Sequence, residues 1–316
     1  MDGEPVISID RPAADVRQHI FVRSTEVIDY TIFSRGRTIP IHGRPLMMGI
    51  VNITPDSFFD GGRYLSVDRA VAQADALVEE GADILDLGAE STRPGAVPVG
   101  EQEEMDRLLP VLSEVVKRTA VPISVDTMKS RVARAALDAG ASIINDVTAM
   151  RFDPEMASVI ATYGAAVVLM HMQGMPATMQ QAPRYDDVVS EVRDFFSERI
   201  AAAEQAGIVK SRIVLDPGFG FGKLQKHNME LLSQLPAFSG FGCPLLAGLS
   251  RKAFLGKILD KPVEGREWGT AAAVALAVDR GAAIIRVHDV ASMKDVVRVA
   301  AAIRSAPLTL KQDHYA

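Results

Sequence analysis

Short apolar runs alternate with amphipathic stretches along most of this chain, and this repetition restricts the possible folds more than any other feature. Eight strand-like runs stand at Leu46–Val51, Ile84–Leu87, Ile123–Val125, Ile143–Ile144, Val167–Met170, Ile213–Leu215, Leu245–Leu246 and Ile284–Val287. Each is followed by a predicted helix, at Val67–Glu80, Glu101–Arg118, Ser130–Ala139, Pro154–Tyr163, Asp186–Ala206, Met229–Leu235, Trp268–Arg280 and Met293–Arg304. Strands this short and apolar are typical of parallel sheets that helices cover. The pattern therefore predicts an α/β fold, a (β/α)8 TIM barrel, with a doubly wound open sheet as the alternative.

Two short β-type runs precede the first barrel strand. Tyr30–Phe33 and Thr38–Ile41 are separated by Ser34–Arg37, a pattern that predicts a hairpin capping one end of the larger fold. Residues 1–27 mix Pro, Asp and Arg with few apolar residues and show no period, so we expect a poorly ordered lead-in there. The predicted organisation is a lead-in over residues 1–27 and a single barrel domain over residues 28–316 that includes the hairpin.

The composition indicates a cytoplasmic protein without nucleic-acid or membrane partners. The chain has 316 residues and is 48% apolar, which is enough to bury a large core. Its net charge of −6, without a block of like charges, argues against nucleic acid as the main partner. No apolar run approaches the length of a membrane span. The single cysteine, Cys243, excludes an intramolecular disulfide and suits a reducing compartment.

Polar or charged residues follow each of the predicted barrel strands. They are Asn52, Glu90–Arg93, Asp126–Thr127, Asn145–Asp146, His171, Asp216, Ser250–Lys252, Arg286 and His288–Asp289. In a (β/α)8 barrel the reactive residues lie just after the carboxyl ends of the strands, so we expect these side chains to share one site. Helix N-capping is the simpler explanation for about half of them, because Asp and Asn are common caps. Capping does not account for the basic members, Arg93, Lys252, Arg286 and His288.

The expected site combines a floor of hydrogen-bonding groups with a positively charged rim. Asp126, Asn145 and Asp216 supply the groups that an amino-pyrimidinone ring can bind, and Lys252 adds a donor. Arg286 and His288 are two residues apart, so they face the same side of an extended segment. The loops after the last two strands of such barrels often bind phosphate, which a guanidinium group suits well. The sequence predicts a heterocycle at the floor and an anion at the rim.

Two motifs do not predict further sites. Gly218–Lys223 resembles a phosphate-binding loop, but Pro217 occupies the place of its first Gly and Leu224 the place of its Ser or Thr. His171 lacks a second His at metal-ligand spacing, so a core or rim position is favoured over a zinc site.

The segment Asn52–Gly62 has the composition of a turn, yet it carries two adjacent aromatic residues, Phe58 and Phe59. By itself it fits a turn that packs its aromatic rings on the core as well as it fits a functional loop. Together with seven other segments, however, it resembles the dihydropteroate synthase family. The others, in the family's order, are Glu90–Gly95, Val125–Thr127, Ile144–Val147, Leu169–His171, Asp216–Lys223, Ser250–Lys252 and Arg286–Val290.

The resemblance implies a transferase that joins 6-hydroxymethyl-7,8-dihydropterin pyrophosphate to p-aminobenzoate with Mg²⁺, commonly as a homodimer. It assigns the pterin to Asp126, Asn145, Asp216 and Lys252, and the pyrophosphate to Arg286, His288 and Asn52. It assigns p-aminobenzoate to Thr92, Arg93, Phe221 and Ser250. Asn52 is also the implied metal contact, and Arg286, His288 and Lys252 are the implied catalytic residues.

The implied chemistry is a dissociative substitution. Arg286, His288 and Mg²⁺ are expected to hold the charge that develops on the departing pyrophosphate, so no covalent nucleophile is required. Residues 52–62 and 91–100 are expected to close as loops and exclude water, with Phe58 and Phe59 as candidate walls of the p-aminobenzoate pocket.

Two rival functions use the same barrel. A methyltetrahydrofolate-type pterin barrel would share the Asp and Asn floor but would not require both loops and the pair Arg286 and His288. A catalytically silent barrel should have lost site residues, and none of the implied residues is missing from the sequence.

Overall fold

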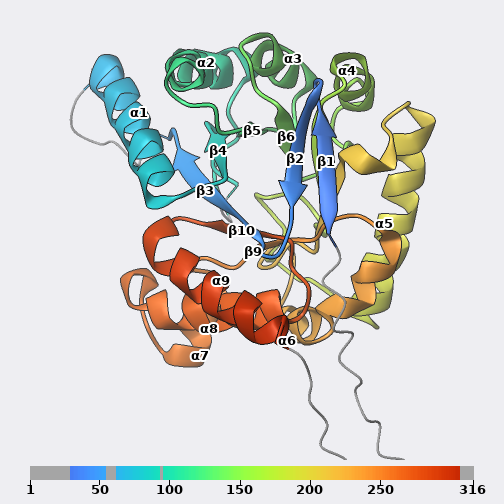
Figure 1. The fold of residues 1–316 in the computed structure, drawn as a ribbon. Coiled ribbons are helices and arrows are strands. Elements are labelled where there is room, and N and C mark those ends of the chain that lie inside the picture. Colours follow the sequence, from blue (N-terminus) through green and yellow to red (C-terminus); the bar gives the residue numbers. More distant parts are fainter. Residues whose placement is uncertain (1–28, 55–61, 93–94, 307–316) are drawn as a thin grey trace, which may run out of the picture.

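The strands of this protein close into a parallel barrel surrounded by helices. The computed structural model describes residues 29–54, 62–92 and 95–306 (Figure 1). The eight-stranded sheet has the order β8-β7-β6-β5-β4-β3-β10-β9, and its paired strands are parallel. A parallel bridge between Leu215 and Leu245 joins β8 to the segment entering β9 and completes the ring. The predicted (β/α)8 TIM barrel is confirmed.

The barrel strands are β3 (Leu46–Asn52), β4 (Ile84–Gly88), β5 (Ile123–Asp126), β6 (Ile143–Asp146), β7 (Ala166–Met170), β8 (Ile213–Asp216), β9 (Leu246–Gly248) and β10 (Ile284–Val287). The α-helices in the described part of the chain are α1 (Gly62–Glu80), α2 (Glu101–Arg118), α3 (Ser130–Asp138), α4 (Met156–Tyr163), α5 (Val188–Gln205), α6 (Gln225–Ser233), α7 (Ala253–Leu259), α8 (Glu267–Asp279) and α9 (Val290–Arg304). None of them is both long and apolar enough to cross a bilayer.

The structure corrects three helix predictions. Helix α1 begins at Gly62, five residues before the predicted start at Val67. The helix predicted at Met229–Leu235 is α6, which begins at Gln225 and gives way to the 3₁₀ segment Leu235–Phe241. Helix α7 was not predicted, because its seven residues include Gly256 and are too short to show a clear period. A Cβ atom at Gly256 would lie 2.3 Å from Nε of Arg266, so the arginine side chain would have to move to admit one.

The core has two layers because alternate strand residues face opposite sides of the sheet. Met47, Leu85 and Val167 face outward and pack against the surrounding helices. Met48, Ile84 and a ring of similar residues fill the barrel interior at its amino-terminal end: Ile143, Val168, Val214, Leu246 and Ile284. Both layers are apolar, which explains why the strands carry continuous apolar runs rather than alternating ones.

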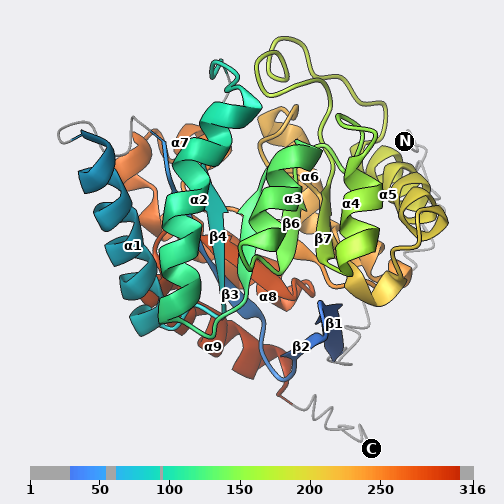
Figure 2. The same cartoon turned by 90° about the horizontal axis from the view of Figure 1, so that it is seen from above.

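The predicted N-terminal hairpin is confirmed and closes the amino-terminal end of the barrel. Strands β1 (Tyr30–Ser34) and β2 (Arg37–Ile41) are antiparallel. Ile32, Ile39 and Ile41 are buried against the interior residues of the barrel. Figure 2 shows the hairpin at the opposite end from the long loop after β7. With one end plugged, only the carboxyl ends of the strands remain available for a site.

Candidate active site

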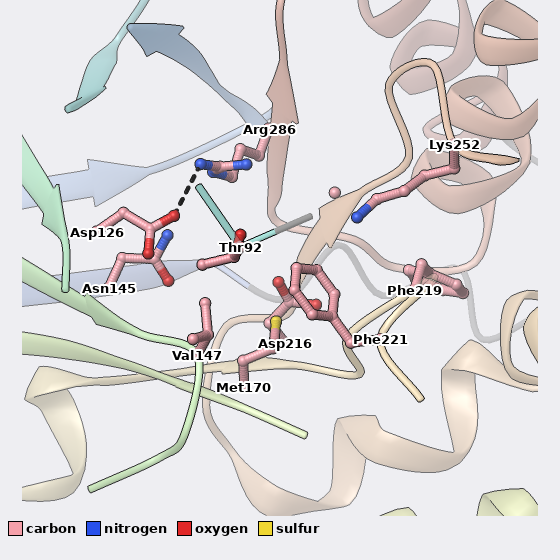
Figure 3. Close-up of a pocket in the computed structure, with 11 residues that line it drawn as sticks. Thr92, Asp126, Asn145, Val147, Met170, Asp216, Phe219, Phe221, Lys252 and Arg286 are labelled. Carbon is pink, nitrogen blue, oxygen red and sulfur yellow. Dashed lines mark hydrogen bonds and ion pairs between the residues drawn. The ribbon is translucent and has the colours of Figure 1, made fainter. Parts of the chain in front are cut away.

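A pocket lies at the carboxyl ends of the barrel strands (Figure 3). It is lined by Thr92, Asp126, Asn145, Val147, Met170, Asp216, Phe219, Phe221, Gly248, Lys252 and Arg286. Most of the residues predicted for the site therefore lie together, although they come from segments spread over most of the sequence. Barrel closure brings them together, since they lie near the carboxyl ends of several different strands or in the loops that follow them.

The side chain of Arg286 crosses the floor of the pocket and is held by two carboxylates. Its Nε donates to Oδ2 of Asp86 at 2.6 Å, and Nη2 donates to Oδ2 of Asp126 at 3.2 Å. The same Asp86 oxygen accepts a bond of 3.1 Å from Nδ2 of Asn145. Although burial opposes it, the charges of Asp86 and Asp126 raise the pKa of Arg286. Arg286 is therefore a fixed cation at the centre of the site.

Asp126, in the same floor, has a strongly perturbed acidity. Burial raises its pKa to about 8, and the neighbouring charge of Asp86 adds to this effect against the attraction of Arg286. A protonated carboxyl group can donate one hydrogen bond as well as accept others. Asp126 is thus able to present either a donor or an acceptor to a heterocycle near neutral pH.

Asp216 and Lys252 form the opposite side of the pocket. Oδ1 of Asp216 accepts a bond of 2.7 Å from the backbone N–H of Gly218, while burial raises the pKa of this carboxyl group. Burial also lowers the pKa of Lys252 to about 8, against the attraction of Asp216. The Lys252 Nζ lies 4.4 Å from the centroid of the Phe221 ring, so the ammonium group covers one face of that ring.

His288 and Ser250 lie beside the pocket and bind each other. Nδ1 of His288 and Oγ of Ser250 are 2.9 Å apart, and the backbone N–H of His288 also donates to this hydroxyl at 3.3 Å. Burial lowers the pKa of His288 to about 4, and Arg286 and Arg251 lower it further. His288 is therefore neutral at pH 7 in the free protein.

Thr92 reaches the pocket from the loop after β4, and a buried ionic cluster holds the base of that loop. Nζ of Lys129 lies 2.5 Å from Oε2 of Glu90 and 2.5 Å from Oε2 of Glu104. Oε1 of Glu90 accepts a bond of 2.9 Å from the N–H of Val99, across the loop. Both ends of the loop are thus tied to the same lysine.

The remaining predicted residues have different positions. Asn52 ends strand β3 and is half-buried at the mouth of the barrel. Arg93, Phe58 and Phe59 lie outside the described residues, so their predicted roles stay predictions.

Comparison with known proteins identifies the family. The family model for pterin binding enzymes matches residues 48–288. Dihydropteroate synthase of Escherichia coli K12 is 46% identical over 275 residues, which cover 87% of this chain and 97% of the relative. The chain belongs to the dihydropteroate synthase family.

Solved structures of the family share the fold over almost their whole length. The enzyme of Xanthomonas albilineans with 4-aminobenzoic acid is 49% identical, with a TM-score of 0.83 over 89% of this chain and all of that one (100%). The same enzyme in complex with 7,8-dihydropteroate has a TM-score of 0.79 at 47% identity, over 88% of this chain and 100% of that one. The resemblance drawn from the eight segments is confirmed.

The sequence patterns did not indicate Asp86 as a site residue and gave no structural role to Lys223. Asp86 stands inside the apolar run Ile84–Leu87, and its position there was a usable signal, because a buried charge requires a partner. The sequence pattern places Lys223 only in a segment that lacks the spacing of a phosphate-binding loop. In the structure Lys223 is 3% exposed and bonded to protein groups. His171 is buried next to it, in agreement with the predicted core position.

Proposed function

We propose that the pocket at the barrel mouth is where this chain carries out the reaction of its family. In that reaction, 6-hydroxymethyl-7,8-dihydropterin pyrophosphate and p-aminobenzoate condense to 7,8-dihydropteroate and pyrophosphate, a step of folate biosynthesis. The observation that carries the assignment is the convergence of Asp126, Asn145, Asp216, Lys252 and Arg286 on one pocket. The family supplies the transferase activity, and this convergence supports its location.

The pterin ring is assigned to the floor of the pocket. Asp126 and Asp216 are acceptors for ring N–H groups, while Asn145 offers both a donor and an acceptor. Lys252 supplies a donor from the opposite side. Asn145 is already oriented by its bond to Asp86, so its amide does not have to be ordered when the ring binds.

p-Aminobenzoate is assigned to the space between Phe221 and the loop that carries Thr92 and Arg93. The Phe221 ring offers an apolar face for the aromatic amine. Ser250 is the proposed partner of the carboxylate. Its single O–H, which is donated to Nδ1 of His288 in the free protein, turns to the carboxylate when the substrate binds.

The pyrophosphate group is assigned to Arg286 and His288. With its proton on Nε2, neutral His288 accepts a bond from Ser250 through Nδ1 and donates through Nε2 to an anion. Arg286 contributes a full positive charge held by Asp86 and Asp126. These groups stabilise the charge that develops as the C–O bond to pyrophosphate breaks, which favours a dissociative substitution by the weakly nucleophilic arylamine.

We propose Asn52 as the protein contact of a magnesium ion. No cluster of three or more His, Cys, Asp or Glu side chains suited to a metal occurs among the described residues. A site built from one amide oxygen, water and the substrate phosphates fits this donor set, because Mg²⁺ usually keeps several waters and binds through phosphates. The ion would neutralise charge on the pyrophosphate.

We also propose that the chain acts as a homodimer in the cytoplasm. Helix α8 exposes an apolar stripe formed by Trp268, Ala272 and Leu276, although its opposite face is already buried. A helix that is apolar on all sides is normally covered on all sides. The single thiol of Cys243 is buried, which suits a reducing compartment.

The reaction is tested by incubating the protein with the pterin pyrophosphate, p-aminobenzoate and Mg²⁺ and measuring released pyrophosphate. Release that depends on p-aminobenzoate is expected; a methyltetrahydrofolate-type barrel or a silent barrel would give none. Arg286→Ala and His288→Ala should each lower kcat while circular dichroism stays unchanged, and normal kcat in both variants would contradict the pyrophosphate assignment. Asp216→Ala should abolish calorimetrically measured pterin binding.

A further inference from the structure

Lys223 is a buried lysine that the proposed reaction does not use, and burial lowers its pKa to about 7 against the attraction of Asp216. Its side chain folds back into the segment that precedes it, Asp216–Gly222. Nζ lies 2.9 Å from Nδ1 of His171, 3.1 Å from the carbonyl oxygen of His171, 3.0 Å from that of Gly218 and 3.0 Å from that of Phe221. One ammonium group therefore joins the end of strand β7 to two points of the loop after β8.

The backbone of this loop leaves no room on the side facing β7. Gly218 and Gly222 have φ values of +67° and +58°, in the left-handed region. A Cβ atom on Gly218 would lie 2.0 Å from the carbonyl oxygen of His171, and one on Gly222 would lie 2.4 Å from that of Gln173. The loop is thus pressed against the backbone of residues 171–173, and Lys223 bonds across this same contact.

Side chains from different parts of the chain donate hydrogen bonds to consecutive backbone carbonyl groups of this loop. Gln180 donates to the carbonyl of Gly220, and Tyr185 donates to that of Gly222 at 2.8 Å. Lys223 binds the carbonyl of Phe221, the residue whose ring lines the pocket. Of these donors, Lys223 is the one that acts on the pocket residue itself.

Lys223 does not line the pocket. Burying an ammonium group is costly unless hydrogen bonds compensate for the lost water, so an apolar residue would fill this volume at lower cost. The free-energy cost of burying Lys223 is explained if its hydrogen bonds hold the loop after β8 in the conformation that the site requires.

We propose that Lys223 is a positioning residue that holds the Phe221 ring in place as the wall of the p-aminobenzoate part of the pocket. The proposal rests on the proposed function for the identity of the substrate. Whether Lys223 fixes the loop Gly218–Phe221 can be measured by hydrogen exchange without any substrate.

The test compares Lys223→Met with Lys226→Met. The first change removes the ammonium group and keeps most of the stem. The second removes an exposed lysine three residues further along. In Lys223→Met, hydrogen exchange of the amides of Gly218, Gly220 and Phe221 should accelerate, and KM for p-aminobenzoate should rise about tenfold while KM for the pterin pyrophosphate changes less than about twofold. Lys226→Met should match the wild type in all three measurements.

Unchanged exchange in Lys223→Met would overturn the proposal, and so would faster exchange with an unchanged KM for p-aminobenzoate. A Phe221→Ala variant separates this failure from a failure of the proposed function. If Phe221→Ala raises KM for p-aminobenzoate, the assigned site stands and only the role of Lys223 is lost. If it does not, the substrate assignment fails as well.

Lys223→Met leaves three carbonyl groups without this donor, so a second variant covers the case in which it does not fold. His171→Phe removes the Nδ1 contact and keeps the other three, and the new ring can preserve the edge-to-face packing on Phe195, whose ring centroid lies 4.8 Å from that of His171. The same pattern of exchange and KM is expected at smaller amplitude. Its absence in a folded His171→Phe protein would overturn the proposal.

Discussion

Asp86 is fully buried beneath the pocket, and one of its carboxylate oxygens accepts bonds from both Arg286 and Asn145. It touches the groups assigned to the pyrophosphate and to the pterin without lining the pocket itself. A hydrogen bond to a charged group contributes about 1.5–3 kcal/mol, more than one between neutral groups. At the residue scale, the orientation of Arg286 therefore depends in part on a carboxylate that does not line the pocket.

Asp86→Asn keeps the shape of this side chain and removes its charge. We expect kcat/KM for the pterin pyrophosphate to fall about tenfold to hundredfold, because Arg286 loses the charge of one of the two carboxylates that hold it. Steady-state kinetics will measure the change. Ser124→Ala is the matched control, since Ser124 is also buried, pairs with Asp86 across strands β4 and β5, and has no hydrogen-bond partner for its Oγ within the described residues. Wild-type kinetics in Asp86→Asn would refute the role.

At the scale of elements, the hairpin β1–β2 stabilises the barrel but lies away from the pocket, so it can be changed without changing the site. It lies at the end of the barrel opposite the pocket and buries Ile32 in the barrel interior. The backbone N–H of Arg35 donates to the carbonyl of Gly164 at 2.8 Å, and Nη1 of Arg35 donates to that of Leu137 at 2.6 Å. The hairpin is therefore joined to the barrel by both apolar packing and hydrogen bonds.

Ile32→Ala should lower the free energy of unfolding by roughly 2–5 kcal/mol, the usual range for emptying a buried isoleucine site. Urea unfolding will measure this loss, and kcat/KM of the folded variant should equal that of the wild type. Phe33→Ala, on the exposed face of the same strand (45% exposed), should change the unfolding free energy much less. Equal losses in the two variants would show that the hairpin does not plug the barrel as described.

At the scale of the whole molecule, the fold carries a buried neutral histidine whose protonation opposes folding. Burial lowers the pKa of His171 to about 2 from the ordinary 6.5, with the charges of Lys223 and Arg151 adding to the effect. Below pH 6.5 the unfolded chain takes up a proton that the folded chain does not, so stability is lost as the pH falls. The loss from this group is about 3 kcal/mol at pH 4.

His171→Phe should remove that part of the acid sensitivity. Urea unfolding at pH 7 and pH 4 will give the loss of stability for each protein, and the loss should be smaller in the variant. The titrating groups other than His171 are common to both proteins, although Lys223 loses its contact with the ring nitrogen in the variant, so the difference reports mainly on His171. The same loss in both would mean that His171 is protonated in the folded protein.

The proposed dimer is also a property of the whole molecule. Trp268 is 78% exposed on α8, so Trp268→Glu should shift sedimentation from dimer to monomer at micromolar concentration. Val209→Glu places the same charge at another exposed apolar residue and should leave the dimer intact. A wild-type protein that sediments as a monomer would refute the dimer itself.

The sequence by itself determined the alternation of strands and helices, the hairpin and the polar residues at the strand ends, because each of these follows from local periodicity and residue type. It predicted the pocket residues Asp126, Asn145, Asp216 and Lys252 through their positions after strands. Only the tertiary structure decided which of them bind one another. Asp86 and Arg286 are 200 positions apart, and Lys223 reaches back 52 positions to His171. Such contacts depend on barrel closure and on how a loop folds over its own lysine, which no local pattern encodes.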